Sequence, residues 1–389
     1  MEPYGMIYLD NAATSYPKPR QVSDEVRRCL TQYGGNPGRG AHSLSLAAAE
    51  KVYECRSLAA SMFEAPSPDR VVFTLNTTHA LNTVIKGLLR RGDHVLISDM
   101  EHNAVYRPIW RLANDGIITY DVFPSMVGEE NRSAARICAA IARRLRPETR
   151  MVVCTHASNL CSATMPIAEI GRFCHRHGLL FVVDGAQSAG HLPLSVREDA
   201  IDALCLPGHK GLLGPQGCGM AILGDGILPD SLIEGGNGVD SLEGGMPDYP
   251  PERYESGTLP TPAIAGLCEG LRIVSERGLP AISEYERSVF RRARELLGNM
   301  PGVTLYVPEY EGSVLLFNLD GVDSEHTAGA LNRLGICVRG GYHCAALAHK
   351  TLKTPAGGAV RASFGIYNHP SHAEALATAL RRIRTELLH

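Results

Sequence analysis

The feature that most constrains the fold is a regular alternation of short β-rich runs with amphipathic segments between Arg70 and Leu223. Such alternation is typical of strand–helix–strand units built around a mostly parallel sheet. The expected strands span 70–75, 94–98, 117–123, 150–155, 179–184, 203–206 and 219–223. The sequence therefore predicts one α/β domain in the middle of the chain.

Residues 228–262 differ in character because they are rich in Gly and Pro, and they predict a long irregular loop of the kind that is usually functional. After it we expect helices near 262–277 and 282–299, strands near 303–306 and 313–319, a helix near 323–334, strands at 337–339 and 359–363, and a final helix at 372–388. This pattern predicts a smaller α+β unit. We place the large domain at 18–255 and the small domain at 1–17 together with 256–389.

Net charge favours a small-molecule ligand over nucleic acid or a membrane as partner. The chain has 389 residues, enough for two domains, and its 38 Lys+Arg and 41 Asp+Glu give a net charge of −3. This balance gives no electrostatic reason to expect nucleic acid or an anionic membrane as partner. The first residues lack the pattern of a signal peptide, and no apolar run is long enough to span a bilayer. We therefore expect a soluble, cytoplasmic protein.

Eleven cysteines are present, an odd number, and none forms a CxxC pair. A disulfide framework and a closed zinc site are therefore not expected, and no metal is predicted. Most of these cysteines should be buried, because free cysteine is among the most buried residue types. Any exception needs an argument of its own.

The densest chemistry lies in FVVDGAQSAGH and LPGHKGLLGPQG. Asp184 ends an apolar strand, and Lys210 follows the next strand, so both side chains can reach the carboxyl edge of one sheet, where open α/β folds bind ligands. An enzyme that uses pyridoxal 5'-phosphate (PLP) needs this pair. The lysine amine bonds to the cofactor, and the carboxylate keeps the pyridine nitrogen protonated. Taken singly, Lys210 could be a surface lysine and Asp184 a helix N-cap.

Two further segments reach the same edge. In LNTTHALN a strand turns into a helix through Thr77 and Thr78, and a helix N-terminus there offers N–H groups and hydroxyls to a phosphate. The same residues would also make an ordinary N-cap. His102 follows the next strand, where its ring could stack on an aromatic cofactor, although a lone histidine is more often structural.

The ordered motifs YLDNAATSYPKP, NPGRGAH, NTTHALN, MEHNAVYRPI, SNLCSAT, VVDGAQSAGH, PGHKGLLGPQG, YESGT, RGGYHCA and VRASFGIYN cover nearly the whole chain. Together they resemble the class V aminotransferase-fold group of fold type I PLP enzymes, and within it the cysteine desulfurase and selenocysteine lyase family. RGGYHCA is similar to the RxGHHCA signature of its SufS-like, type II members. The fold that the resemblance implies is α/β, with a mostly parallel seven-stranded sheet in the large domain and a smaller α+β C-terminal domain.

The resemblance also implies a role for each matching residue. Lys210 would hold PLP as a Schiff base, Asp184 would pair with the pyridine nitrogen, Gln187 would bond to the ring hydroxyl, and His102 would stack on the ring. The phosphate would be held by Thr77, Thr78 and His209, and by Thr258 of the other subunit of a homodimer. Asn159 would orient cofactor and substrate.

Arg361 indicates the kind of substrate, and Cys344 indicates the kind of reaction. Arg361 lies among apolar residues in GGAVRASFG, and its guanidinium can clamp a substrate carboxylate in bidentate fashion, a role that Arg339 could share. Cys344 lies in a loop with glycines and basic residues, where a reactive thiolate is favoured. Lys210 would remove the α-proton of L-cysteine, and Cys344 would take the sulfur as a persulfide, giving L-alanine.

The chain departs from the family pattern in ways that leave its partner open. Pro207 stands where the family commonly has a phosphate-binding serine, and Tyr342 replaces a histidine. The 228–262 loop, although long, is shorter than the hairpin-bearing segment of typical SufS-like enzymes. The protein that accepts the sulfur is not identified by the sequence. An aminotransferase, or a lyase acting on a C–S bond or on L-selenocysteine, remains an alternative in which Cys344 is incidental. A cofactor-free scaffold is a third.

Overall fold

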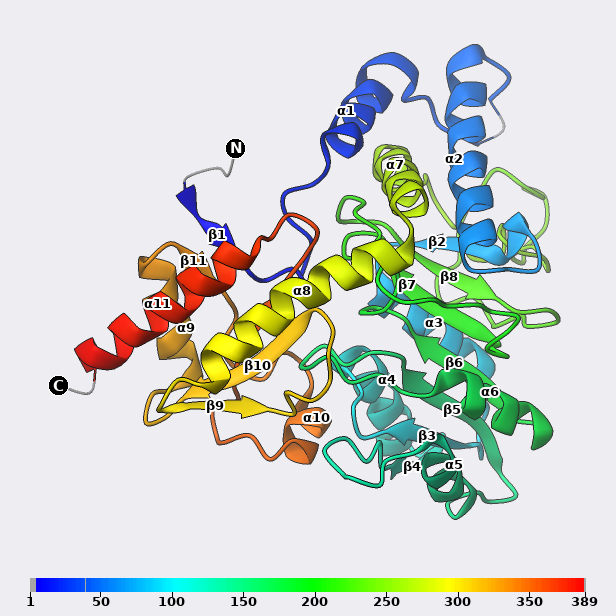
Figure 1. Cartoon of the computed structure of the whole chain (residues 1–389). Coiled ribbons are helices and arrows are strands. Elements are labelled where there is room, and N and C mark those ends of the chain that lie inside the picture. The colour runs from blue at the N-terminus through cyan, green and yellow to red at the C-terminus, as the bar shows by residue number, and fades with distance from the viewer. Residues whose placement is uncertain (1–4, 39, 388–389) are drawn as a thin grey trace.

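The computed structural model describes residues 5–38 and 40–387, and its central element is a seven-stranded sheet (Figure 1). The strand order is β2-β8-β7-β6-β5-β3-β4, and the pairs from β7 through β6, β5 and β3 to β4 are parallel. Strand β8 runs antiparallel to both β2 and β7. The predicted α/β class with a mostly parallel seven-stranded sheet is therefore confirmed.

The strands of this sheet are β2 (Val71–Thr74), β3 (His94–Ser98), β4 (Thr119–Phe123), β5 (Thr149–Thr155), β6 (Leu180–Asp184), β7 (Ala203–Pro207) and β8 (Gly219–Leu223). The helices around it are α1 (Arg20–Arg28), η2 (Cys29–Tyr33), α2 (Ser43–Met62), η3 (Pro68–Arg70), α3 (Thr77–Leu88), α4 (Asn103–Asn114), α5 (Ala134–Ala142), α6 (Ile167–Arg176) and α7 (Thr261–Arg277). No helix or strand lies between β8 and α7, as the composition of 228–262 predicts.

Both faces of the sheet are buried, because successive side chains of a strand point to opposite faces. In β6, Phe181 and Val183 join the core cluster that includes α7, whereas Val182 joins the cluster that includes α3 and α4. Every strand residue from Phe181 to Asp184 is buried. Unbroken apolar runs such as LLFVVD thus predict the central strands, and their polar ends predict the edge that is open to a ligand.

The second unit is an antiparallel sheet of order β12-β10-β9, packed on helices, with a short parallel pair β1–β11 beside it (Figure 1). Its elements are β1 (Ile7–Tyr8), α8 (Leu279–Gly298), β9 (Val303–Tyr306), β10 (Val314–Leu319), α9 (Ser324–Arg333), β11 (Ile336–Cys337), α10 (Ala346–Thr351), β12 (Val360–Ser363) and α11 (Pro370–Leu387). The smaller α+β unit is as predicted. The domain boundaries remain a prediction, since α7 packs in the core of the large unit.

Small differences from the expected elements occur at their ends. The strand expected at 337–339 is β11, only two residues long, and Arg339 instead forms an isolated bridge opposite Arg361. This bridge matters for the site because it brings the two arginines together. Of the final helix expected at 372–388, residue 388 lies outside the described residues, and the helix begins two residues earlier than expected. Within the described part of the chain, no helix is both long and apolar enough to cross a membrane.

A buried ion pair fastens the end of the irregular 228–260 segment to the large unit. Arg56 of α2 donates to both carboxylate oxygens of Glu255, at 2.8 and 2.7 Å, and both side chains are nearly inaccessible. The backbone N–H of Phe73 in β2 donates to the same carboxylate at 2.6 Å. Glu255 therefore joins the segment to both a helix and a strand.

Replacing Glu255 with alanine should lower the free energy of unfolding by about 3–5 kcal/mol, because it leaves the Arg56 guanidinium buried without its partner. Urea denaturation of the purified protein measures the change. Glu386→Ala is the control, since it removes a solvent-exposed pair with Arg382 and should have little effect. Equal stability of the two variants would contradict this role of Glu255.

Candidate active site

One cavity opens at the carboxyl ends of the parallel strands β5, β6 and β7. Its lining residues are Asn76, Thr77, Thr78, His102, Ala104, Thr155, Ala157, Asn159, Asp184, Ala186, Gln187, Pro207, His209 and Lys210. Eight of the nine residues that the resemblance implies for cofactor binding therefore lie around one space. Their assembly follows from the topology, because parallel strands present their carboxyl ends at the same edge.

Asp184 is the last residue of β6 and is 2% exposed. Burial raises the pKa of its carboxyl group, and this effect is opposed by the backbone N–H of Ala186, which donates to Oδ1 at 2.9 Å, and by the charge of Lys210. A carboxylate in such a place is stabilised by a further positive or protonated partner. A protonated pyridine nitrogen would be such a partner.

Lys210 lies in a tight turn whose backbone accepts hydrogen bonds from side chains of the N-terminal segment. Ser15 donates through Oγ to the backbone oxygen of Lys210 at 2.9 Å, and Lys18 donates through Nζ to that of His209 at 2.7 Å. Position 211 must be glycine, because a Cβ there would lie 2.2 Å from the backbone oxygen of Ala189. The glycine that follows Lys210 in the GHKG motif is therefore required by the close packing of this turn.

Removal from water lowers the pKa of Lys210 to about 8, although Asp184 opposes the shift. A lowered pKa means that the neutral amine, the nucleophilic form, becomes the main form as the pH rises through about 8, whereas an ordinary lysine needs about 10.4. We expect the rate at which the cofactor-free protein takes up PLP to rise with a midpoint near pH 8. Absorbance of the coloured protein across a pH series measures this rate, and a midpoint above 10 would contradict the expectation.

The N-terminus of α3 offers a place for the phosphate. Asn76 caps the helix by accepting the N–H of His79 at 2.9 Å, so Thr77 and Thr78 are not needed as caps. The hydroxyl of Thr77 is buried and has no hydrogen-bond partner among the described residues. A phosphate oxygen would satisfy it, with help from the free N–H groups of the first helical turn.

Two histidines complete the cavity wall, and both are neutral at physiological pH. Burial and the charge of Lys210 lower the pKa of His102 and of His209 to about 4. His102 caps α4 by accepting the N–H of Ala104 on Nδ1 at 3.0 Å, which fixes the ring at the cavity. Nδ1 of His209 lies 3.1 Å from the hydroxyl of Thr14. A neutral ring at position 102 can stack on an aromatic ligand without a charge penalty.

These features fit the cofactor that the sequence resemblance implies. The unpartnered Thr77 hydroxyl suits the phosphate, the buried Asp184 carboxylate suits the pyridine nitrogen, and the amine of Lys210 suits the aldehyde. Gln187 donates through Nε2 to the backbone oxygen of Ala12 at 2.9 Å, and its side chain lines the cavity. The donor set therefore matches PLP from one end of the molecule to the other.

Asp10, which the sequence reasoning missed, joins the two predicted carboxylate-binding arginines. Arg361 is 3% exposed and donates to Asp10 Oδ1 at 2.8 Å and to the backbone oxygen of Asn159 at 2.9 Å. Arg339 is more exposed and donates to Asp10 Oδ2 from Nε at 3.1 Å and from Nη2 at 2.8 Å. The two guanidinium groups and one carboxylate leave a net positive charge. Within the described chain, Nε of Arg361 is buried and unpartnered.

Cys344 is the exposed cysteine among the eleven, all of which lie in described residues. Both His343 and Cys344 adopt positive φ values, 49° and 55°, a strained conformation for these residue types. The large unit holds this loop by two hydrogen bonds. Asn159 Nδ2 donates to the backbone oxygen of His343 at 2.8 Å, and the N–H of Asn103 donates to that of Cys344 at 2.7 Å. The loop is thus fixed to residues that neighbour the cavity.

Thr258 is the one predicted cofactor residue that does not line this cavity. It is exposed and lines a separate depression with Asn36, His42 and Asn237. This position leaves the predicted role in the site of another subunit untested. Asp10 and Asn103 could have been suspected from YLDNAAT and MEHNAV, but nothing in those motifs shows what they contact.

Comparisons with known proteins agree with this geometry. The aminotransferase class-V family model matches residues 7–376, and the chain belongs to this family. A probable cysteine desulfurase of Methanothermobacter thermautotrophicus is 34% identical over 386 residues, which cover 97% of this chain and 94% of that protein. A cysteine desulfurase of Escherichia coli O139:H28 is 32% identical over 393 residues, with 97% and 93% coverage.

Solved structures of similar proteins share the whole fold. The apo cysteine desulfurase from Thermococcus onnurineus NA1 superposes with a TM-score of 0.88 at 30% identity, covering 98% of this chain and 95% of that one. The cysteine desulfurase CsdA from Escherichia coli gives a TM-score of 0.86 at 26% identity, with the same coverage. The family predicted from the sequence motifs is confirmed.

Proposed function

We propose that this chain is a PLP-dependent cysteine desulfurase, which converts L-cysteine to L-alanine and carries the sulfur as a persulfide on Cys344. The names of its relatives support the reaction, and the lining of the cavity supports the cofactor. The observation that carries the proposal is the Cys344 loop, because it presents an exposed thiol and is hydrogen-bonded to Asn103 and Asn159 beside the cavity.

When bound, PLP supplies an aldehyde for the amino group of the substrate and a ring that accepts electrons. Lys210 would hold the cofactor, and its amine would remove the proton from the substrate Cα. Its pKa of about 8 suits this task, because a general base works best when its pKa lies near the operating pH. Asp184 holds a proton at the pyridine nitrogen, and Thr77, Thr78 and His209 hold the phosphate.

Arg361 binds the carboxylate of the substrate. Its Nε is unpartnered within the described chain, and a substrate carboxylate would neutralise the net positive charge that Arg361, Arg339 and Asp10 leave. Asn159 contributes in two ways, since its backbone oxygen holds Arg361 and its side chain holds the Cys344 loop. Substrate binding and thiol placement therefore depend on the same residue.

Cys344 completes the reaction by attacking the substrate sulfur. A bond forms between the Cys344 sulfur and the substrate sulfur while the substrate C–S bond breaks. The electron pair of that bond stays with the substrate carbon, which takes a proton and leaves as L-alanine. The Cys344 thiol must lose its proton before the attack, since the thiolate is the nucleophile.

The test is to incubate the purified yellow protein separately with L-cysteine and L-selenocysteine and to map persulfide by mass spectrometry. Persulfide confined to Cys344 after L-cysteine treatment is the expected result. Alanine formed from L-selenocysteine alone, with no persulfide from L-cysteine, would favour a selenocysteine lyase. Colourless protein without cofactor would contradict both enzymes and favour a scaffold.

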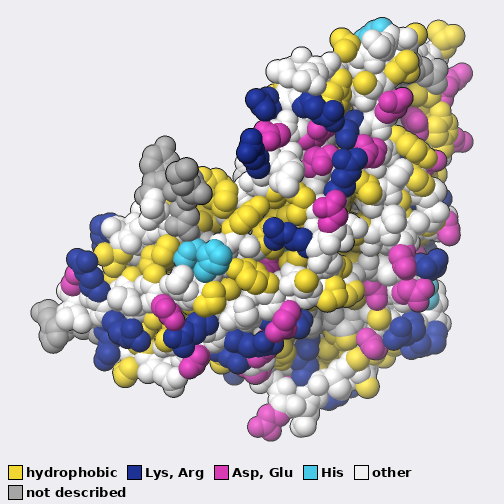
Figure 2. All heavy atoms as spheres, turned by 45° about the horizontal axis from the view of Figure 1, so that its top comes forward, with side chains coloured by type: hydrophobic (Ala, Val, Ile, Leu, Met, Phe, Trp, Pro, Cys, Tyr) yellow, Lys and Arg dark blue, Asp and Glu magenta, His cyan; other side chains and the backbone are white. Residues whose placement is uncertain are grey.

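We also propose a homodimer in the cytoplasm that hands its sulfur to an acceptor protein. Figure 2 shows hydrophobic side chains on the flank of the projecting part that carries α2. Exposed apolar residues there include Leu44, Leu46 and Tyr53 of α2, and Leu242 of the 228–260 segment is fully exposed. A surface of this kind favours association. Light scattering of the purified protein at micromolar concentration should give twice the mass of one chain.

A further inference from the structure

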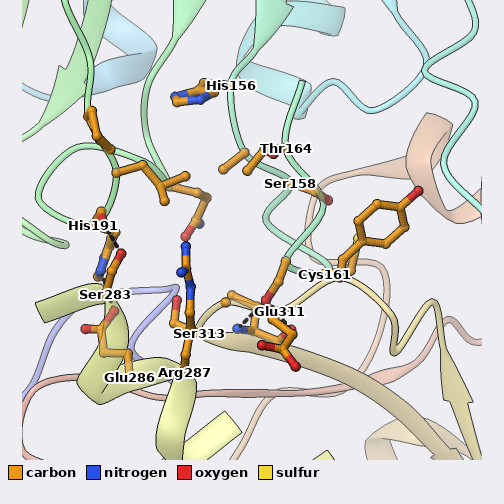
Figure 3. A pocket seen from close by; sticks show the side chains of 18 of the residues that line it. His156, Ser158, Cys161, Thr164, His191, Ser283, Glu286, Arg287, Glu311 and Ser313 are labelled. Carbon is orange, nitrogen blue, oxygen red and sulfur yellow. Dashed lines mark hydrogen bonds and ion pairs between the residues drawn. The ribbon is translucent and has the colours of Figure 1, made fainter. Parts of the chain in front are cut away.

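A second cavity, which we call the α8 cavity, lies between the two units and is lined by His156, Gln187, His191, Glu286, Arg287 and Tyr310, among others (Figure 3). Its volume is about 500 Å³, within the range of small-molecule sites. It shares only Ala157 and Gln187 with the lining of the candidate active site. The proposed desulfurase reaction uses none of the other groups around it.

Glu286 and His191 form a buried pair on one wall. Nδ1 of His191 lies 2.8 Å from Oε2 of Glu286, which is only 2% exposed. Burial lowers the pKa of His191, but the charge of Glu286 and the hydrogen bond to it together outweigh burial, so the net shift is upward and favours the ion pair. Oε1 of Glu286 has no partner within residues 5–38 and 40–387. A buried carboxylate oxygen without a donor is costly, and a ligand N–H would remove that cost.

Arg287 supplies the opposite charge. In Figure 3 its side chain rises from α8 into the cavity. In the described part of the chain its guanidinium makes no hydrogen bond and no ion pair, and it is not paired with Glu286, its neighbour in sequence. Glu311, which also lines the cavity, is already paired with Arg291 and Arg294. The guanidinium is therefore available to an anion.

A third polar atom faces the same space from the large unit. His156 is 8% exposed, and its Nδ1 has no hydrogen-bond partner among the residues described. Burial lowers its pKa to about 4, so the ring is neutral and can donate or accept one hydrogen bond. Its backbone N–H donates to the oxygen of Asp184 at 3.0 Å, which places the α8 cavity directly behind the candidate active site.

We propose that the α8 cavity binds a small zwitterion of amino-acid type, with its carboxylate on Arg287 and its ammonium group on Glu286. Within the described residues, Oε1 of Glu286 has no donor and the guanidinium of Arg287 has no acceptor, although both face one space, so a ligand that carries both signs satisfies each. A simple anion would leave Oε1 of Glu286 without a donor. A simple cation would leave Arg287 without an acceptor.

The experiment uses holoenzyme and two probes that cannot condense with an aldehyde, N,N-dimethylglycine and 4-(dimethylamino)butanoate, which differ in the distance between their charges. Isothermal titration calorimetry and thermal shift measure binding, and neither depends on turnover. We expect at least one probe to bind once per chain at millimolar or lower concentration. Butanoate and N,N-dimethylpropylamine, which carry one charge each, should bind at least about tenfold more weakly, a difference of about 1.4 kcal/mol.

Arg287→Met and Glu286→Gln should each weaken binding of the zwitterion at least about tenfold. Arg292→Met is the matched control, because Arg292 lies on the same helix but pairs with Glu295 and Glu374 outside the cavity, and it should bind the probe unchanged. Arg287→Met keeps the test valid if Glu286→Gln fails to fold. Absence of binding by both probes, equal binding of the single charges, or binding insensitive to Arg287→Met would each overturn the proposal. The binding measurements do not depend on turnover. A negative desulfurase assay would therefore not affect the test of the α8 cavity.

Discussion

Replacing Lys210 with alanine should abolish the formation of L-alanine from both L-cysteine and L-selenocysteine. Loss of a general base alone costs about 10²–10⁴-fold in rate, and Lys210 is also the residue proposed to hold the cofactor. We therefore expect a loss at or beyond the upper end of that range. The purified variant should also lose the absorbance of lysine-bound PLP. Alanine release measured by amino-acid analysis, together with the absorbance spectrum, checks both effects.

A second substitution at position 210 separates the amine of Lys210 from its charge, and a lysine elsewhere serves as control. Lys210→Arg keeps a cation but provides no comparable nucleophile or base, so it should be as inactive as the alanine variant. Lys86→Ala, which removes an exposed lysine of α3, should retain full activity. Activity surviving in Lys210→Arg would mean that the charge alone is needed. Activity surviving in Lys210→Ala would refute the proposed role of Lys210 as cofactor anchor and base.

Replacing Cys344 with serine should remove the persulfide and lower sulfide release from L-cysteine by about a thousandfold or more, the scale on which loss of a catalytic nucleophile acts. Serine is nearly the same size, and the backbone contacts of the loop with Asn103 and Asn159 do not involve the thiol. The variant should therefore keep its fold and its colour. Mass spectrometry and a sulfide assay under reducing conditions provide the two readouts.

Cys138→Ser is the matched control, because Cys138 is a partly buried thiol in α5, away from the loop, and its loss should leave both readouts unchanged. Retained sulfide release in Cys344→Ser would refute the persulfide mechanism. Loss of sulfide release with intact alanine formation from L-selenocysteine would indicate a lyase for which the thiol is not needed.

Much of the fold follows from the sequence because the pattern is strong and local. Continuous apolar runs such as LLFVVD indicate strands that are buried on both faces. The Gly- and Pro-rich 228–262 stretch indicates a segment without regular structure. Strand ends are less well marked. The strand expected at 337–339 ends at Cys337, and the backbone of Arg339 instead forms an isolated β-bridge with that of Arg361. Local sequence does not encode this long-range contact.

The candidate cofactor site was also predictable, since its residues lie at the ends of strands and the topology alone brings such ends together. Asp184 and Lys210 meet for this reason. Their pKa shifts were predictable only in direction, because the size of a shift depends on how much water the surrounding residues exclude. The roles of Gln187, Asn159 and Thr258 could be assigned only by resemblance.

The sequence by itself determined the α/β class and the strand-end residues that face one cavity, because strand periodicity and strand ends are local properties of the chain. Its ordered motifs determined the family by resemblance. Only the tertiary structure decided that Asp10 bridges Arg339 and Arg361, and that Asn103 and Asn159 hold the Cys344 loop. It also decided that Oε1 of Glu286 and the guanidinium of Arg287 face a second cavity with no partner among the described residues. Each of these contacts joins segments far apart in sequence, and long-range packing, not local pattern, sets which polar groups find a partner.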